Sequence, residues 1–115
     1  MSGGAFDYNQ FKIRMIADDI EETIRNSGKE KTTEELKNHY GYDYERWIEK
    51  YPEDKFYYTY PPEVLKEFKA AVHNLHVAEI YAQRVDWLLS GDDGEESFIE
   101  RLKKDLDKLS KEEEI

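Results

Sequence analysis

Apolar side chains recur at every third or fourth position over most of the chain, which is the spacing of one face of an α-helix. The pattern predicts a first helix over residues 8–26, a long central helix over 62–89, and a final helix with Phe98, Leu102, Leu106 and Leu109 on one face. We therefore expect an all-α fold, a small bundle of three main helices. It would form a single domain over 1–110, followed by a frayed charged tail at 111–115.

Residues that start and stop helices mark the boundaries of these elements. Asp7 is placed to cap the first helix, and Gly28 follows its last periodic residue. Pro62 suits the first turn of the central helix, where a missing N–H costs nothing. The boundaries therefore agree with the periodicity.

The stretch between the first and the central helix is irregular and rich in aromatic residues. Thr32 and Glu35 have the spacing of a capping box, which predicts one short helix, and another turn or two is expected over 44–50. Residues 51–62 are interpreted as an extended loop, because no second convincing strand is available to pair with them. Nine aromatic residues lie between positions 40 and 60: Tyr40, Tyr42, Tyr44, Trp47, Tyr51, Phe56, Tyr57, Tyr58 and Tyr60.

The central helix is apolar on more than one side. Its main stripe runs through Leu65, Phe68, Val72, Leu75, Ala78, Ala82, Val85 and Leu89, and other apolar residues lie off that stripe. Such a helix is either surrounded by the other elements or partly buried in an oligomer interface. We therefore expect a homo-oligomer.

Composition narrows the class of partner. Charged residues make up 38% of the 115 residues, and 27 acidic against 17 basic side chains give a net charge of −10. A surface of this sign repels polyanions, so we expect no direct contact with nucleic acid. The charge favours basic protein surfaces, metal ions, or small ligands held in a locally basic pocket.

Three absences bear on the compartment. The sequence contains no cysteine and no run of about 18 apolar residues, so it predicts neither disulfides nor a membrane span. The first residues also lack the basic patch and apolar stretch of a signal peptide. We expect a cytoplasmic protein with no membrane contact.

An acid-rich turn near the end of the central helix is the first candidate for metal chemistry. Asp92 and Asp93 follow Asp86 by about two helical turns, and oxygen ligands of this kind suit hard cations. The spacing does not fit a calcium loop, so we favour capping of the final helix by these acids. Asp86 would then bond its own C-terminal turn or pair with Arg84 or Arg101.

The second candidate for metal chemistry is His73, His76 and Glu79, which share one flank of the central helix. Zinc sites usually draw ligands at i, i+4 or from more than one element. We therefore favour two histidines beside the core stripe, and we predict no metal and no cofactor.

The aromatic segment, combined with arginines, is the main candidate for a binding site. Aromatic faces stack on planar ligands, and guanidinium groups hold phosphates or carboxylates. The alternative is a lid whose rings close over the helical core. The predicted ligand-binding residues are Arg84, Tyr81, Trp87, Arg46, Trp47 and Tyr58, with Arg14 as a further anion anchor.

Catalytic motifs are missing from the sequence. It has no glycine-rich phosphate loop, no nucleophile elbow and no zinc-hydrolase pair. We therefore expect a protein that is not an enzyme.

Two sequence blocks carry a resemblance to a known group of proteins. Residues 2–8 (SGGAFDY) and 81–98 (YAQRVDWLLSGDDGEESF) resemble small uncharacterised proteins of bacteriophages and prophages, and residues 51–54 (YPED) fit that group too. The resemblance extends over most of the chain but brings no activity and no functional residues with it. It implies a phage accessory protein in the cytoplasm of a bacterial host, a class that often acts against host defence.

Three functions remain open on these grounds. The first is sequestration of a small nucleotide-type immune signal in a pocket at a subunit interface. The second is inhibition of a host defence or nucleic-acid enzyme by an acidic, DNA-mimicking surface. The third is a metal-dependent hydrolase that uses the acids and histidines named above.

Overall fold

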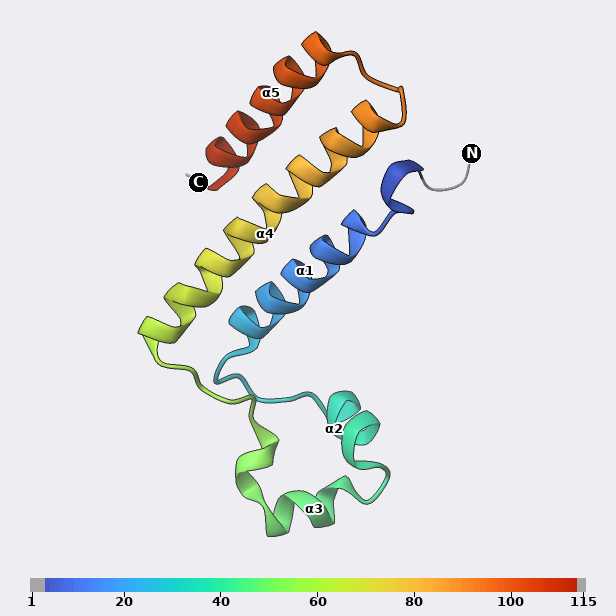
Figure 1. Cartoon of the computed structure of the whole chain (residues 1–115). Helices are drawn as coiled ribbons and strands as arrows, with labels where there is room; N and C mark the ends of the chain where they lie inside the picture. The colour runs from blue at the N-terminus through green and yellow to red at the C-terminus, as the bar shows by residue number, and fades with distance from the viewer. Residues whose placement is uncertain (1–3, 114–115) are drawn as a thin grey trace.

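The computed structural model describes residues 4–113, and over them the chain is all-helical (Figure 1). This confirms that the fold is all-α. Within these residues β pairing is limited to one isolated antiparallel bridge between Glu30 and Phe56. The elements in chain order are the 3₁₀ helix η1 (Gly4–Phe6), α1 (Gln10–Asn26), α2 (Thr33–Tyr40), α3 (Tyr44–Lys50), the 3₁₀ helix η2 (Pro52–Lys55), α4 (Pro62–Leu89) and α5 (Glu95–Glu113).

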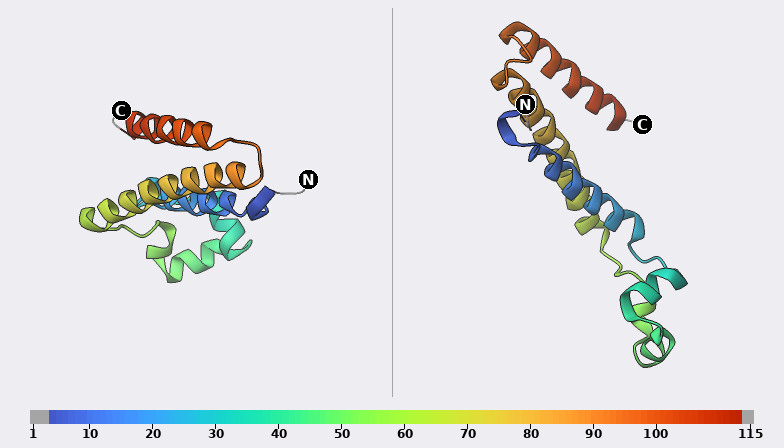
Figure 2. Two further views of the ribbon diagram at one scale, coloured as in Figure 1. Left: turned by 45° about the horizontal axis from the view of Figure 1, so that its top comes forward. Right: turned by 90° about the vertical axis from the view of Figure 1, so that its right-hand side faces the viewer.

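The long helix α4 lies in the middle of the molecule. It packs against α1 along one flank and against α5 along another, and both neighbours run antiparallel to it (Figures 1 and 2). Packing between α1 and α5 themselves is minor over the described residues. The resulting array is elongated, with principal extents of 62 × 34 × 18 Å.

Residues 29–61, which we call the aromatic lobe, extend beyond the end of the array where α1 finishes and α4 begins (Figure 2). The helices α2 and α3 contact each other, and α3 contacts η2, while their packing on the three long helices is minor. The lobe returns to α4 through Tyr60, whose ring meets Phe68 edge-on at 5.0 Å. It therefore does not form the lid over the helical core that was the alternative interpretation.

Local signals set some helix ends as expected and others differently. The capping box at α2 is confirmed, because the Glu35 N–H donates to the Thr32 hydroxyl at 3.1 Å and the Thr32 N–H donates to the Glu35 carboxylate at 3.0 Å. The predicted cap at Asp7 is wrong: α1 begins at Gln10, and Asp7 has φ 50° in a left-handed turn before it. This turn folds η1 back against α4.

The buried core is small. Its apolar members, within residues 4–113, are Ala17, Leu36 and Val72, and no large side chain is fully buried. The predicted stripe of α4 is mostly half-buried, and Leu89 at its end is 65% exposed. The three-residue and four-residue spacing therefore located the helix correctly but overstated how much of the stripe the chain covers.

The structure describes only the first three residues of the expected frayed tail at 111–115. Residues 111–113 continue α5 as regular helix, and residues 114–115 lie outside the described residues. Of the N-terminal SGGAFDY block, Ser2 and Gly3 lie outside them too. The structure describes that block from Gly4 onward.

Candidate functional site

The six predicted ligand-binding residues fall in two separate regions. Those on α4 lie near its C-terminal end, beside α5, and the others lie in the aromatic lobe beyond its N-terminal end (Figure 1). A single pocket cannot include both sets. The α4 set is Arg84, Tyr81 and Trp87, and the lobe set is Arg46, Trp47 and Tyr58.

Arg84 is committed to contacts inside the chain. Its Nε donates to the Asp105 carboxylate at 2.6 Å, a terminal nitrogen lies 3.7 Å from Asp93, and its guanidinium carbon lies 4.6 Å from the centre of the Trp87 ring. The side chain is only 14% exposed. Arg84 therefore fastens α5 to α4, and its charge is already balanced by two carboxylates.

Asp93 holds the turn between α4 and α5. Its side chain is 2% exposed and accepts a hydrogen bond from Arg101 on α5, with Arg84 on its other side. Asp93 thus joins the last turn of α4 to the first turns of α5 through two arginines. A pair between Arg101 and Asp86 is one of the options predicted from the sequence. In the structure Arg101 pairs with Asp93 instead.

Asp86 has a different task from Asp93. It is buried, and its carboxylate accepts hydrogen bonds from the backbone N–H of Ala5 at 2.6 Å, the N–H of Phe6 at 3.3 Å and the side-chain amide of Gln10 at 3.1 Å. Ser90, in the C-terminal turn of α4, lies 3.5 Å away. Asp86 therefore fixes the N-terminal turn, and the pairing with Arg84 or Arg101 is not formed.

The contact around Asp86 joins the two blocks that carry the phage resemblance. Gly4 has φ +65°, and a Cβ atom placed on it would lie 2.7 Å from an Asp86 carboxylate oxygen. A glycine is therefore required for this close approach. Residues 4–6, the part of the N-terminal block in contact with Asp86, therefore dock onto the 81–98 block.

The histidine group does not assemble into one site. His73 contacts Glu113 on α5 at 2.6 Å, His76 lies 3.7 Å from Glu21 on α1, and buried Glu79 pairs with Arg14 on α1 at 2.8 Å. His73 therefore pairs with α5, whereas His76 and Glu79 lie against two different residues of α1. Within residues 4–113 no three His, Cys, Asp or Glu side chains are arranged to hold a metal ion.

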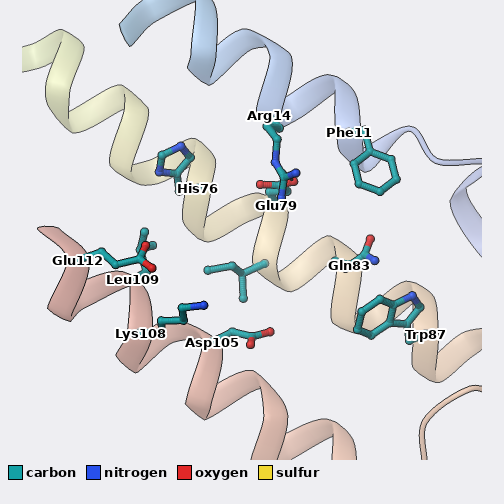
Figure 3. Close-up of a pocket in the computed structure, with 11 residues that line it drawn as sticks. Phe11, Arg14, His76, Glu79, Gln83, Trp87, Asp105, Lys108, Leu109 and Glu112 are labelled. Carbon is teal, nitrogen blue, oxygen red and sulfur yellow. Dashed lines mark ion pairs between the residues drawn. The ribbon is translucent and has the colours of Figure 1, made fainter.

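A groove runs between α1, α4 and α5 (Figure 3). Its volume of about 450 Å³ falls within the range of small-molecule sites. Of the six predicted residues only Trp87 lines this groove. The groove is lined by Phe11, Arg14, His76, Glu79, Ile80, Gln83, Trp87, Asp105, Lys108, Leu109 and Glu112.

The charges in this groove do not favour an anion. Glu79, Asp105 and Glu112 outnumber Arg14 and Lys108, and Arg14 is paired with Glu79. Lys108 was not singled out from the sequence, since a lysine on the polar side of an amphipathic helix carries no signal of its own. Only the docking of α5 on α4 brings it to the groove, beside Asp105 and Leu109 (Figure 3).

The aromatic lobe displays its rings outward. Tyr42 is 94% exposed, Tyr58 71%, Phe56 47% and Trp47 44%. These four side chains, which we call the exposed ring set, protrude from a segment of about thirty residues that has a single buried apolar residue, Leu36. Exposed tyrosine and tryptophan side chains are enriched in protein interfaces.

Stacking holds the centre of the lobe in place. The Trp47 ring stacks on Tyr40 at 5.6 Å and lies 4.7 Å from Tyr51, and its indole N–H donates to Asp54 at 2.7 Å. Lys31 sits over the Tyr40 ring at 5.4 Å. Trp47 is therefore fixed on one side while much of its surface remains accessible.

Comparison of the chain with protein-family models, with curated proteins and with solved structures finds no match in any of the three. The fold and contacts above therefore carry the functional argument by themselves. Among the described helices, none is both long enough and apolar enough to cross a bilayer.

Proposed function

We propose that the protein is a phage accessory protein that binds a host protein through its aromatic lobe and acts without catalysis, against host defence. The observation that carries this proposal is the exposed ring set of Tyr42, Trp47, Phe56 and Tyr58. Tyrosine and tryptophan dominate the energetics of protein interfaces, because they bury a large area at a small cost in side-chain entropy. The three long helices serve as the scaffold that presents the lobe.

The net charge of −10 supports a partner with a basic surface, such as a nucleic-acid enzyme of the host. Electrostatic attraction of this kind mainly raises the rate of association and weakens as salt screens it. We propose the host cytoplasm as the place of action, in keeping with a chain that has no cysteine. Full mimicry of DNA is less well supported, because lysines alternate with acids along α5.

A nucleotide-type ligand is the second candidate. The groove between α1, α4 and α5 supports it, since Phe11 and Trp87 offer aromatic surface and Arg14 and Lys108 offer positive charge. Two observations place it behind a protein partner: the groove carries more acids than bases, and Arg84 is occupied by Asp93 and Asp105.

The test of the main proposal uses the purified full chain as bait in a lysate of a bacterial host. Trp47→Ala and Tyr58→Ala should each weaken binding of the recovered host protein by about 30-fold, the effect of losing an interface hot spot of about 2 kcal/mol. The matched control is Ile99→Ala, an α5 side chain with 50% exposure, which should bind like the wild type. Wild-type affinity in both lobe variants would refute the lobe as the binding surface.

The nucleotide alternative is tested by thermal shift with cyclic and ADP-ribose-type nucleotides. A ligand that binds the folded chain raises its unfolding temperature. Stabilisation that is lost in Lys108→Ala and kept in Tyr58→Ala would establish the groove as a nucleotide-binding site and would replace the main proposal. The absence of stabilisation at millimolar nucleotide would remove this alternative.

A further inference from the structure

The described chain leaves far more surface exposed than a folded monomer of its size. Its accessible area is 8805 Å², whereas about 6,600 Å² is expected for a monomeric protein of 13.8 kDa. Its radius of gyration is 19.8 Å, against about 13 Å for a compact domain of 115 residues. The chain thus exposes about 2,200 Å² more than a compact monomer of its mass, and this surplus is spread over its elongated shape.

One flank of helix α4 faces away from both α1 and α5, with η1 packed only near its C-terminal end. Glu79 and Asp86 face α1 through Arg14 and Gln10, and Arg84 faces α5 through Asp105. The third flank carries Ala78, Tyr81, Val85 and Leu89, which follow one another at three-residue and four-residue intervals and therefore share a face. Tyr81 is 45% exposed and Leu89 65%.

Helix α1 extends this flank. A shallow hollow brings Ile13 of α1 beside Ala82 of α4, on the side away from Phe11 and Arg14. Ile16, one turn further along the same stripe, is 52% exposed. We call the joint surface of Ile13, Ile16, Ala78, Tyr81, Val85 and Leu89 the α1–α4 back face.

We propose that a second copy of this chain docks on the α1–α4 back face and forms a two-fold dimer with the two α4 helices antiparallel. The surplus of exposed area argues for a partner that stays bound, because obligate homodimers bury large and apolar surfaces, and the α1–α4 back face is the continuous apolar part of that surplus along α4. A copy of the chain is the one partner that is present whenever the chain itself is made.

Charge selects this face over the groove on the opposite side. The groove holds Glu79, Asp105 and Glu112, whereas the face of α4 that runs from Ala70 through Ala78 to Leu89 carries no charged residue. Interface cores are depleted in charge in the same way. The groove thus stays open to solvent in the dimer.

The sequence of α4 also fits the two-fold arrangement. An axis beside Ala78 brings Ala71 of one chain opposite Val85 of the other, and Asn74 opposite Ala82, so small residues face larger ones. Alanine at the axis permits close approach of the two helix backbones. This inference is independent of the aromatic lobe, which lies at the far end of α4.

The first test is the mass of the particle in solution, measured by light scattering after gel filtration. The wild type should have twice the 13.8 kDa of one chain. Tyr81→Lys and Leu89→Glu should each give single chains, because a charge enters the apolar face and the carboxylate introduced at position 89 would lie opposite Glu67 of the other chain. Ile99→Lys, at a site on α5 with 50% exposure, should remain a dimer. A wild type of 13.8 kDa, or a dimer that survives both back-face substitutions, would overturn the proposal.

The second test examines the antiparallel arrangement of the two α4 helices. Because the chain has no native cysteine, any disulfide must form between introduced cysteines. Ala78→Cys should form a disulfide between chains under mild oxidation, because an axis beside this residue brings the two Cα atoms within bonding range. Ser110→Cys, exposed on α5, is the matched control and should stay reduced. Equal cross-linking of both variants, or none at Ala78→Cys, would overturn the antiparallel arrangement. Host-protein binding by the lobe is measured separately, so either proposal can fail alone.

Discussion

At the scale of single residues, buried carboxylates organise this molecule more than apolar side chains do. Asp86 accepts hydrogen bonds from backbone N–H groups of the N-terminal turn. Asp93 pairs with two arginines, and Glu79 pairs with Arg14 between α1 and α4. Each buried charge has a partner, which is the condition for a carboxylate to remain inside a protein. With so small an apolar core, these contacts define how the helices meet.

Gly4 is the residue whose identity matters most for the N-terminal turn. Gly4→Ala places a Cβ 2.7 Å from an Asp86 carboxylate oxygen at a backbone φ of +65°. We therefore expect the free energy of unfolding to fall by about 1–2 kcal/mol. The measurement is urea unfolding followed by circular dichroism. Gly94→Ala is the control, since a Cβ there meets nothing within 4 Å, and an equal loss in both variants would contradict the role given to Gly4.

The sequence signal at these positions was only partly readable. The spacing of the acids near the end of α4 indicates capping or metal binding, and only the metal interpretation treats Asp86 and Asp93 as members of one cluster. The structure separates them, because Asp86 faces α1 and η1 while Asp93 faces α5. Partners about 80 residues away in the chain leave no periodic trace, so the pairing of Asp86 with Ala5 was not predictable.

At the scale of elements, helices whose signals are local were predictable. The signals that set these helices are close in the sequence to what they determine. The capping box at Thr32 and Glu35 lies at the start of α2, and Pro62 lies at the start of α4. The three-residue and four-residue spacing of apolar positions in α4 is also a local signal. The aromatic lobe was not predictable in its arrangement. Composition alone could not tell rings that stack, such as Tyr40 on Trp47, from rings that protrude, such as Tyr42.

The docking of α5 on α4 depends on Asp93 and can be tested at that scale. Asp93→Ala leaves Arg84 and Arg101 without this shared acceptor, so we expect a loss of about 1.5–3 kcal/mol, the range for hydrogen bonds to charged groups. Amide hydrogen exchange should rise throughout α5 and less in α1. Asp92→Ala, at the exposed neighbouring position, is the control, and faster exchange in α5 of that variant too would argue against a specific role of Asp93.

At the scale of the whole molecule, the chain is an elongated scaffold with two outward surfaces. The exposed ring set lies in the lobe at one end of α4, and the α1–α4 back face lies along its length. The proposed dimer would present two lobes at opposite ends of the antiparallel α4 pair. Two linked lobes would raise the apparent affinity for a partner that has two binding sites.

The most direct test of the claim that this chain completes its fold with a partner copy is thermal unfolding at several protein concentrations. If folding and dimerisation are coupled, the unfolding temperature should rise by about 6 °C for a hundredfold increase in concentration, given the unfolding enthalpy usual for chains of this length. An unfolding temperature that stays constant over that hundredfold range would contradict the account.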